Sequence, residues 1–179
     1  MVRTRVGYSG GSTQNPTYEN LANHTESFEV DFDPSVISYE KLLDIFWGSH
    51  NPCHGSYSQQ YKAVIFYHND EQKKQALAAK AKTVAKLNSG AITTEILPLK
   101  KFWLAEDYHQ KYYLRHNRAM MSVLNGLYPQ EQDFVNSTAA ARLNGILGSY
   151  GKNTLASELK ALKLPEDAVT KLIEAAARE

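Results

Sequence analysis

The segment HTESFEVDFDP, residues 24–34, places a carboxyl group where an apolar side chain is expected. Phe28, Val30 and Phe32 alternate with polar residues, which is typical of a strand with one buried face, and an Asp-Pro turn ends the pattern. The same alternation puts Glu26 on the apolar face. A carboxyl group among apolar neighbours either pairs with a cation or stays protonated, and a protonated carboxylic acid can act as a general acid. Glu26 stands at the start of the strand, so it could instead lean into solvent.

The second candidate for chemistry is a thiol. Cys53 is the only cysteine, and it lies in SHNPCHGSY between His50 and His54. A cysteine nucleophile needs a neighbouring cation that stabilises its thiolate, and His54 could supply one. The alternative interpretation is a loop cysteine beside two loop histidines. Zinc needs three or four convergent ligands, and no second cluster of ligand residues accompanies these three, so we predict no metal site.

The composition limits the classes of function. A net charge of +1 over 179 residues offers no electrostatic case for binding nucleic acid or an anionic membrane. The chain contains no apolar run of membrane-span length and begins without a signal-peptide pattern, so we expect a cytoplasmic location. Eleven tyrosines against six phenylalanines could line pockets that combine aromatic walls with hydroxyl donors, although surface packing would also explain them.

Periodicity and turn residues predict the elements that must position these groups. Strands are expected over residues 2–8, 26–32, 62–68 and 91–97, and helices over 39–49, 70–88 and 105–117. Ser38 is expected to cap the first helix, and Asn69 with Gln72 resembles a capping box for the second. After about residue 120, Ala- and Leu-rich segments with glycine breaks predict two or three small helices, with Pro165 at a helix start. The fold class is therefore α+β.

Five segments around Glu26 support a resemblance to a known family. In chain order they read GYSGGSTQNPTYENLANHTE, SYEKLLDIFWGSHNP, QQYKAVIFYHNDEQK, ITTEILP and FWLAEDYHQKYYLRHN. Together they resemble the peptide methionine sulfoxide reductase A family over residues 1 to about 118. The resemblance implies a ferredoxin-like α/β sandwich of that family's type. We therefore predict a family domain over residues 1–118 and a helical extension over 119–179.

The resemblance also implies a reaction without a cofactor. In this family a cysteine thiolate attacks the sulfur of methionine S-sulfoxide, a glutamic acid protonates the departing oxygen, and two tyrosine hydroxyls hold that oxygen. The cysteine becomes a sulfenic acid, and a second thiol and then thioredoxin, the expected partner, restore it. Glu26 occupies the place of the acid, and Tyr18 and Tyr61 occupy the places of the oxygen-binding tyrosines.

The sequence departs from the family pattern in several places. The Gly-Cys-Phe-Trp-Gly motif that carries the nucleophile is absent, as is a cysteine near the C-terminus, and Ser56 replaces an acidic residue. We therefore expect a family domain without its N-terminal segment and an interruption at the centre of its sheet. The alternative is a non-catalytic peptide-binding or interaction module of the same fold.

Overall fold

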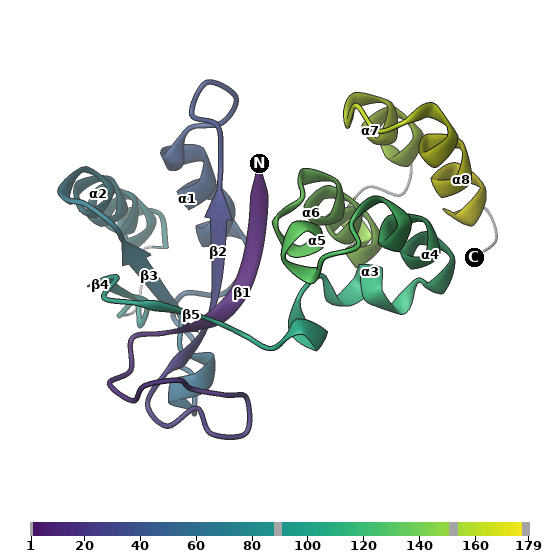
Figure 1. Cartoon of the computed structure of the whole chain (residues 1–179). Helices are drawn as coiled ribbons and strands as arrows, with labels where there is room; N and C mark the ends of the chain where they lie inside the picture. The colour runs from purple at the N-terminus through teal and green to yellow at the C-terminus, as the bar shows by residue number, and fades with distance from the viewer. Residues whose placement is uncertain (1, 88–90, 151–153, 177–179) are drawn as a thin grey trace. The chain divides into compact units, whose positions relative to one another are not determined.

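The computed structural model describes residues 2–87, 91–150 and 154–176 (Figure 1). Its strands are β1 (Arg3–Ser9), β2 (Thr25–Asp31), β3 (Val64–Tyr67), β4 (Glu95–Pro98) and β5 (Phe102–Leu104). Its α-helices are α1 (Tyr39–Gly48), α2 (Asp70–Leu87), α3 (Tyr112–His116), α4 (Arg118–Leu127), α5 (Glu131–Asn136), α6 (Thr138–Gly145), α7 (Leu155–Ala161) and α8 (Glu166–Ala176). Short 3₁₀ helices are η1 (Gln59–Tyr61) and η2 (Asp107–His109), and η3 (Ile146–Tyr150) is a π-helical turn.

The chain divides into two compact units, each described by itself. The first comprises Met1–Val6, Phe28–Phe32 and Glu106–Glu179, and the second comprises Gly7–Ser27 and Asp33–Ala105. Strands β1 and β2 contribute to both. The α+β class expected from the sequence is confirmed, because the described residues combine these helices with paired strands.

The strands form two sheets. Among the described residues, one has the order β2-β1-β5, and the other is the parallel pair β3-β4. In the second unit, helices α1 and α2 pack beside the parallel pair around a core made of Leu43, Trp47, Ile65 and Ala76. Gly7 lets β1 approach β5 closely, because a Cβ there would lie 2.2 Å from the carbonyl oxygen of Trp103.

The predicted helix starts have the expected caps. The Ser38 side chain accepts a hydrogen bond from Lys41 N at 3.2 Å, and Asn69 Oδ1 accepts one from Gln72 N at 2.9 Å. The return bond of the predicted capping box differs, because Gln72 Oε1 accepts from His68 N instead of Asn69 N. The predicted end of the second helix at residue 88 lies outside the described residues.

Two strand predictions need correction. Strand β3 is shorter than the strand expected over residues 62–68, and only Ile65 is buried, while its other three residues are half-buried. Strand β5 was not predicted, since three residues are too few to show an alternating pattern.

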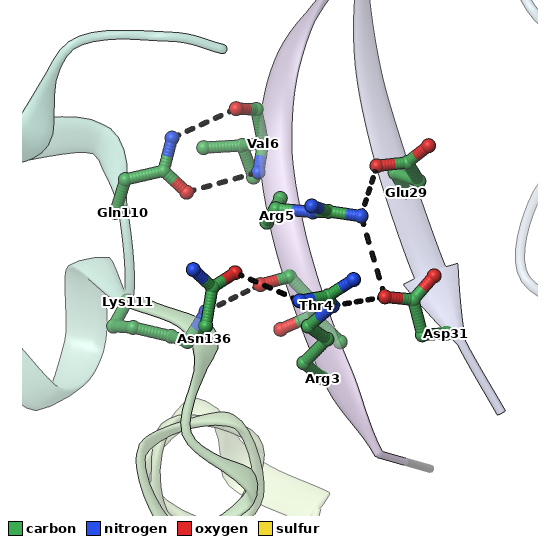
Figure 2. A network of polar contacts seen from close by, with 9 residues as sticks. All are labelled: Arg3, Thr4, Arg5, Val6, Glu29, Asp31, Gln110, Lys111 and Asn136. Carbon is green, nitrogen blue, oxygen red and sulfur yellow. Dashed lines mark hydrogen bonds and ion pairs between the residues drawn. The ribbon is translucent and has the colours of Figure 1, made fainter. Parts of the chain in front are cut away.

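The helix predicted over residues 105–117 is wrong. The segment forms η2 and α3, separated by Lys111 in the left-handed conformation at φ 54°. The Gln110 side chain accepts from Val6 N at 3.1 Å and donates to Val6 O at 2.8 Å, while Lys111 Nζ donates to Thr4 O (Figure 2). These side chains bind the N–H and C=O of Val6 and the C=O of Thr4, and the chain turns at Lys111 where they reach β1. Local periodicity carries no information about such contacts.

The first unit contains a helical core. Its buried side chains are Leu114, Met120, Leu124, Phe134, Val135, Ala140, Leu143, Leu159, Leu172 and Ala175. Helix α8 packs against both α4 and α7, and Pro165 precedes it as predicted (Figure 1). The structure has more helices here than the two or three expected. The predicted domain boundary at residue 118 falls at the start of α4, whereas the C-terminal segment of the first unit already begins at Glu106.

Ion pairs also join β1 to β2 within the first unit. Arg5 pairs with Glu29 at 2.7 Å and with Asp31 at 3.3 Å, and Arg3 also pairs with Asp31 (Figure 2). Opposite charges on adjacent strands stabilise their pairing.

Candidate functional site

Side-chain hydrogen bonds join the start of β2 to η1. The buried Thr25 donates from Oγ1 to the carbonyl oxygen of Gln59 at 2.9 Å. The next residue, Glu26, accepts a hydrogen bond from Gln60 Nε2 to its Oε1 at 2.6 Å. Two adjacent residues of β2 are thus held by two adjacent residues of η1, and Tyr61 completes this 3₁₀ turn.

Tyr61 brings the three residues singled out in the sequence together. Its hydroxyl shares a hydrogen bond with that of Tyr18, which is the largest cause raising the pKa of Tyr61 above its ordinary value. The nearby charge of Glu26 raises the same pKa, because it disfavours a second negative charge. Glu26, Tyr18 and Tyr61 therefore form one cluster, named the Glu26 cluster below.

A tight turn presents Tyr18. Thr17 N and Asn20 N each bond to the carbonyl oxygen of the other residue, and Asn20 N also bonds to Thr17 Oγ1 at 3.1 Å. Tyr18 lies inside this turn and is 43% exposed, while Tyr61 is 61% exposed. Both side chains are thus partly exposed. In their mutual hydrogen bond one hydroxyl donates to the other, so a single phenol proton stays available to an acceptor oxygen.

The orientation of Glu26 corrects a sequence-based expectation. Alternation put Glu26 and Phe28 on one face, and both are indeed exposed, Phe28 by 62%, whereas Thr25 on the opposite face is buried. The shared face was expected to be the buried one, and that expectation is wrong. Alternation determines which residues share a face of a strand, but packing partners from elsewhere in the chain determine which face is covered.

Cys53 lies in a loop that is held by hydrogen bonds with Asn51 and Thr93. Its amide donates to Asn51 Oδ1 at 3.0 Å, and Thr93 bonds to the carbonyl oxygens on both sides of Cys53, at Pro52 and His54. Nδ1 of His50 lies 2.9 Å from the carbonyl oxygen of Phe46. The structure therefore gives separate anchoring contacts to the Cys53 loop and to the Glu26 cluster.

Neither a metal site nor a membrane span is found in the described part of the chain. Within residues 2–87, 91–150 and 154–176, no three His, Cys, Asp or Glu side chains are placed to hold one ion. No helix in these ranges has the length and apolar character needed to cross a membrane.

Gln60 and His24 were missed by the sequence reasoning. Gln60 orients the carboxyl group of Glu26, and His24 bonds to the loop that carries Tyr18. Their positions gave a usable signal, because Gln60 directly precedes Tyr61 and His24 lies two residues before Glu26. A polar side chain beside a reactive group in the chain is a natural candidate for holding it.

Comparisons with known proteins agree on one family. The family model described as peptide methionine sulfoxide reductase matches residues 1–142. A Drosophila melanogaster peptide methionine sulfoxide reductase is 42% identical over 84% of this chain and 61% of its own length. A peptide methionine sulfoxide reductase MsrA from Methanosarcina acetivorans is 46% identical over 63% of this chain and 65% of its own length. The chain thus spans less than two thirds of these relatives.

Solved structures are similar as well. The crystal structure of Mxr1 from Saccharomyces cerevisiae in reduced form matches with a TM-score of 0.59 and 27% identity, covering 64% of this chain and 71% of that one. Methionine sulfoxide reductase A of Corynebacterium diphtheriae matches with a TM-score of 0.55 and 34% identity, covering 65% of this chain and 64% of that one.

Proposed function

This chain belongs to the peptide methionine sulfoxide reductase family, and we propose that its Glu26 cluster binds and protonates the oxygen of methionine S-sulfoxide during reduction to methionine. The observation that carries the proposal is the hydrogen bond between Tyr18 and Tyr61 beside the charge of Glu26. Two phenol donors and one carboxyl group at a single place match the needs of a sulfoxide oxygen, which accepts hydrogen bonds and leaves only after it is protonated.

Each residue has a distinct role in the proposed reaction. When substrate binds, the hydrogen bond between Tyr18 and Tyr61 opens, and both hydroxyls donate to the sulfoxide oxygen and hold it beside the carboxyl group of Glu26. Glu26 is proposed to act as the general acid that gives a proton to this oxygen. Gln60 holds the carboxyl group in place.

The electron balance requires thiols. A thiolate attacks the sulfoxide sulfur, the oxygen takes a proton from Glu26, and methionine leaves while the attacking cysteine becomes a sulfenic acid. A second thiol condenses with the sulfenic acid to give a disulfide and water, and thioredoxin reduces the disulfide in our proposal. We place this reaction in the cytoplasm.

The attacking thiolate is proposed to come from a cysteine that these 179 residues do not contain. Cys53 is the only thiol in the chain, and contacts with Asn51 and Thr93 anchor its loop. The chain then supplies the acid and the oxygen-binding groups, and a Gly-Cys-Phe-Trp-Gly segment of the family type would supply the nucleophile.

A binding experiment tests the role of the cluster. We expect a blocked methionine S-sulfoxide to shift the ring NMR signals of Tyr18 and Tyr61, and expect unoxidised methionine not to. Replacing both tyrosines by Phe should weaken the affinity by about 5- to 150-fold, because two hydrogen bonds of about 0.5–1.5 kcal/mol each are lost. Tyr57→Phe, at a fully exposed position, is the control. Equal binding of the sulfoxide and of unoxidised methionine would contradict the proposal.

A turnover assay tests the source of the thiolate. With dithiothreitol as reductant, the chain alone should show no appreciable reduction of an S-sulfoxide, since acid catalysis by itself contributes roughly 10²- to 10⁴-fold. Fusion of the family-type cysteine segment should restore turnover. Turnover by the unmodified chain that disappears in Cys53→Ser would identify Cys53 as the nucleophile instead. Binding without turnover, even in the fusion, would identify a non-catalytic module.

A further inference from the structure

We infer that His24, as a neutral imidazole with its proton on Nε2, is the positioning residue that holds the Tyr18 loop so that Tyr18 reaches Tyr61. The meaning of this contact for sulfoxide binding rests on the proposed function. The contact itself and its dependence on His24 can be measured without any activity.

The hydrogen bonds of His24 determine its tautomer. The Gly11 amide donates to Nδ1 at 3.3 Å, and Nε2 lies 2.8 Å from the carbonyl oxygen of Thr13. An amide N–H cannot accept, so Nδ1 must be unprotonated, and a carbonyl oxygen cannot donate, so Nε2 must carry the proton. A doubly protonated ring loses the bond from Gly11, and the tautomer with its proton on Nδ1 loses both bonds. The side chain is only 1% exposed, so water cannot readily replace a lost partner.

The ring is also packed tightly against the loop. A Cβ on Gly11 would lie 2.4 Å from Cδ2 of His24, so the imidazole fills the space that a side chain at position 11 would need. The preceding Gly10 has a φ of +84°, which permits the turn into this contact. Glycines at positions 10 and 11 thus allow the backbone to wrap around the ring.

Asn23 binds the same stretch of backbone as His24, and we call these two residues the clamp. Asn23 Oδ1 accepts from the Ser12 amide at 3.0 Å, so residues 23 and 24 together bind the backbone of residues 11–13. The backbone amide of His24 also donates to Leu21 O at 3.0 Å. These contacts close the loop on both sides of the turn that presents Tyr18.

The position of Tyr18 depends on this loop. Residues 23 and 24 bind the backbone of residues 11–13, and Tyr18 lies in the stretch of chain that these bonds close, so the shape of the closed loop sets its place beside Tyr61. Asn23 lies on the surface, whereas His24 is buried, so His24 is the member of the clamp that resists competition from water. Loss of the His24 bonds should therefore open the loop and separate the two hydroxyls.

The titration of Tyr61 reports on this separation. With ¹³Cζ-labelled tyrosine, NMR gives its midpoint, and Tyr61→Phe assigns the signal. Tyr18→Phe removes the largest cause of the raised pKa of Tyr61, so the midpoint should fall. His24→Phe keeps the ring volume but removes both bonds, and we expect the same fall. The double variant should show no further fall. His24→Asn and His24→Gln, which each retain one bond, should lie between.

Controls separate the outcomes. His68→Phe, at an exposed position outside the loop, should leave the Tyr61 midpoint unchanged. A folded His24→Phe variant with the wild-type midpoint, or with effects that add to those of Tyr18→Phe, overturns the inference. Should His24→Phe fail to fold, ¹⁵N NMR of wild-type His24 decides instead, and a proton on Nδ1 overturns the inference. Absence of sulfoxide binding by a chain that retains the coupling would refute the proposed function alone.

Discussion

Gln60 donates a hydrogen bond from Nε2 to Oε1 of Glu26 across 2.6 Å, joining η1 to the start of β2. This contact holds the carboxyl group towards the side of the cluster where Tyr61 lies, one residue after Gln60. The two residues lie 34 positions apart in the chain, and Glu26, which carries the carboxylate, is exposed.

Gln60→Met should weaken the binding of methionine S-sulfoxide by about three- to tenfold. The variant keeps the side-chain length but loses a charge-assisted hydrogen bond, whose contribution is reduced by solvent at an exposed site. Calorimetric titration measures the effect. Gln75→Met is the matched control, because it removes the same kind of bond, Gln75 Nε2 to Glu71 Oε1 at 2.8 Å, from α2. Equal affinities for wild type and Gln60→Met would contradict this role.

Glu26→Gln should lower the pKa of Tyr61 by less than Tyr18→Phe does. The hydrogen bond with Tyr18 is the largest cause of the raised pKa, and the charge of Glu26 is a smaller one. Both substitutions remove an influence that favours the protonated phenol, so both move the titration midpoint down. The ¹³Cζ signal of Tyr61 gives the midpoints, and a larger shift in Glu26→Gln would be the contrary result.

Gln110→Leu should destabilise the protein by about 2–4 kcal/mol. Gln110 is fully buried, and its amide serves both the N–H and the C=O of Val6, which the variant leaves unpaired. Urea unfolding followed by circular dichroism measures the change in the free energy of unfolding. Gln132→Leu, at an exposed position on α5, should change it by less than roughly 0.5 kcal/mol. An unchanged midpoint for Gln110→Leu would show that water replaces both bonds.

Because of Lys111, the free energy of unfolding should rise with pH between about pH 8 and pH 10.5. Burial, with smaller effects from Arg115 and Arg5, lowers the pKa of Lys111 from 10.5 to about 8. Between these two pH values the unfolded chain binds more protons than the folded one, so the free energy of unfolding increases as pH rises. Below about pH 8 the lysine is charged in both states and its burial cost is fully present.

Lys111→Met should remove this part of the pH dependence. We expect the difference in unfolding free energy between wild type and variant to change steadily when urea unfolding is compared at pH 7.5, 8.5 and 9.5. Lys171→Met, at an exposed ion pair on α8, serves as the control and should track wild type across the same range. Parallel curves for wild type and Lys111→Met would contradict the lowered pKa.

Local sequence determined much of the secondary structure. Ser38 and Asn69 predicted two helix starts because a capping side chain bonds to an amide within its own turn. Alternation correctly grouped Glu26 with Phe28 on one strand face. Order of motifs along the chain singled out Glu26, Tyr18 and Tyr61, which lie together in the structure. These features depend on near neighbours in the chain or on chain order, both of which a sequence records.

Tertiary structure alone decided the features that depend on distant partners. The helix expected through Lys111 is broken because Gln110 and Lys111 bond to β1, more than a hundred residues earlier. The exposed state of Glu26 follows from which elements pack on β2, a matter that alternation leaves open. The tautomer of His24 is likewise set by a loop amide and a loop carbonyl that meet only after folding. A pattern along the chain cannot encode these contacts because their geometry exists only in the assembled fold.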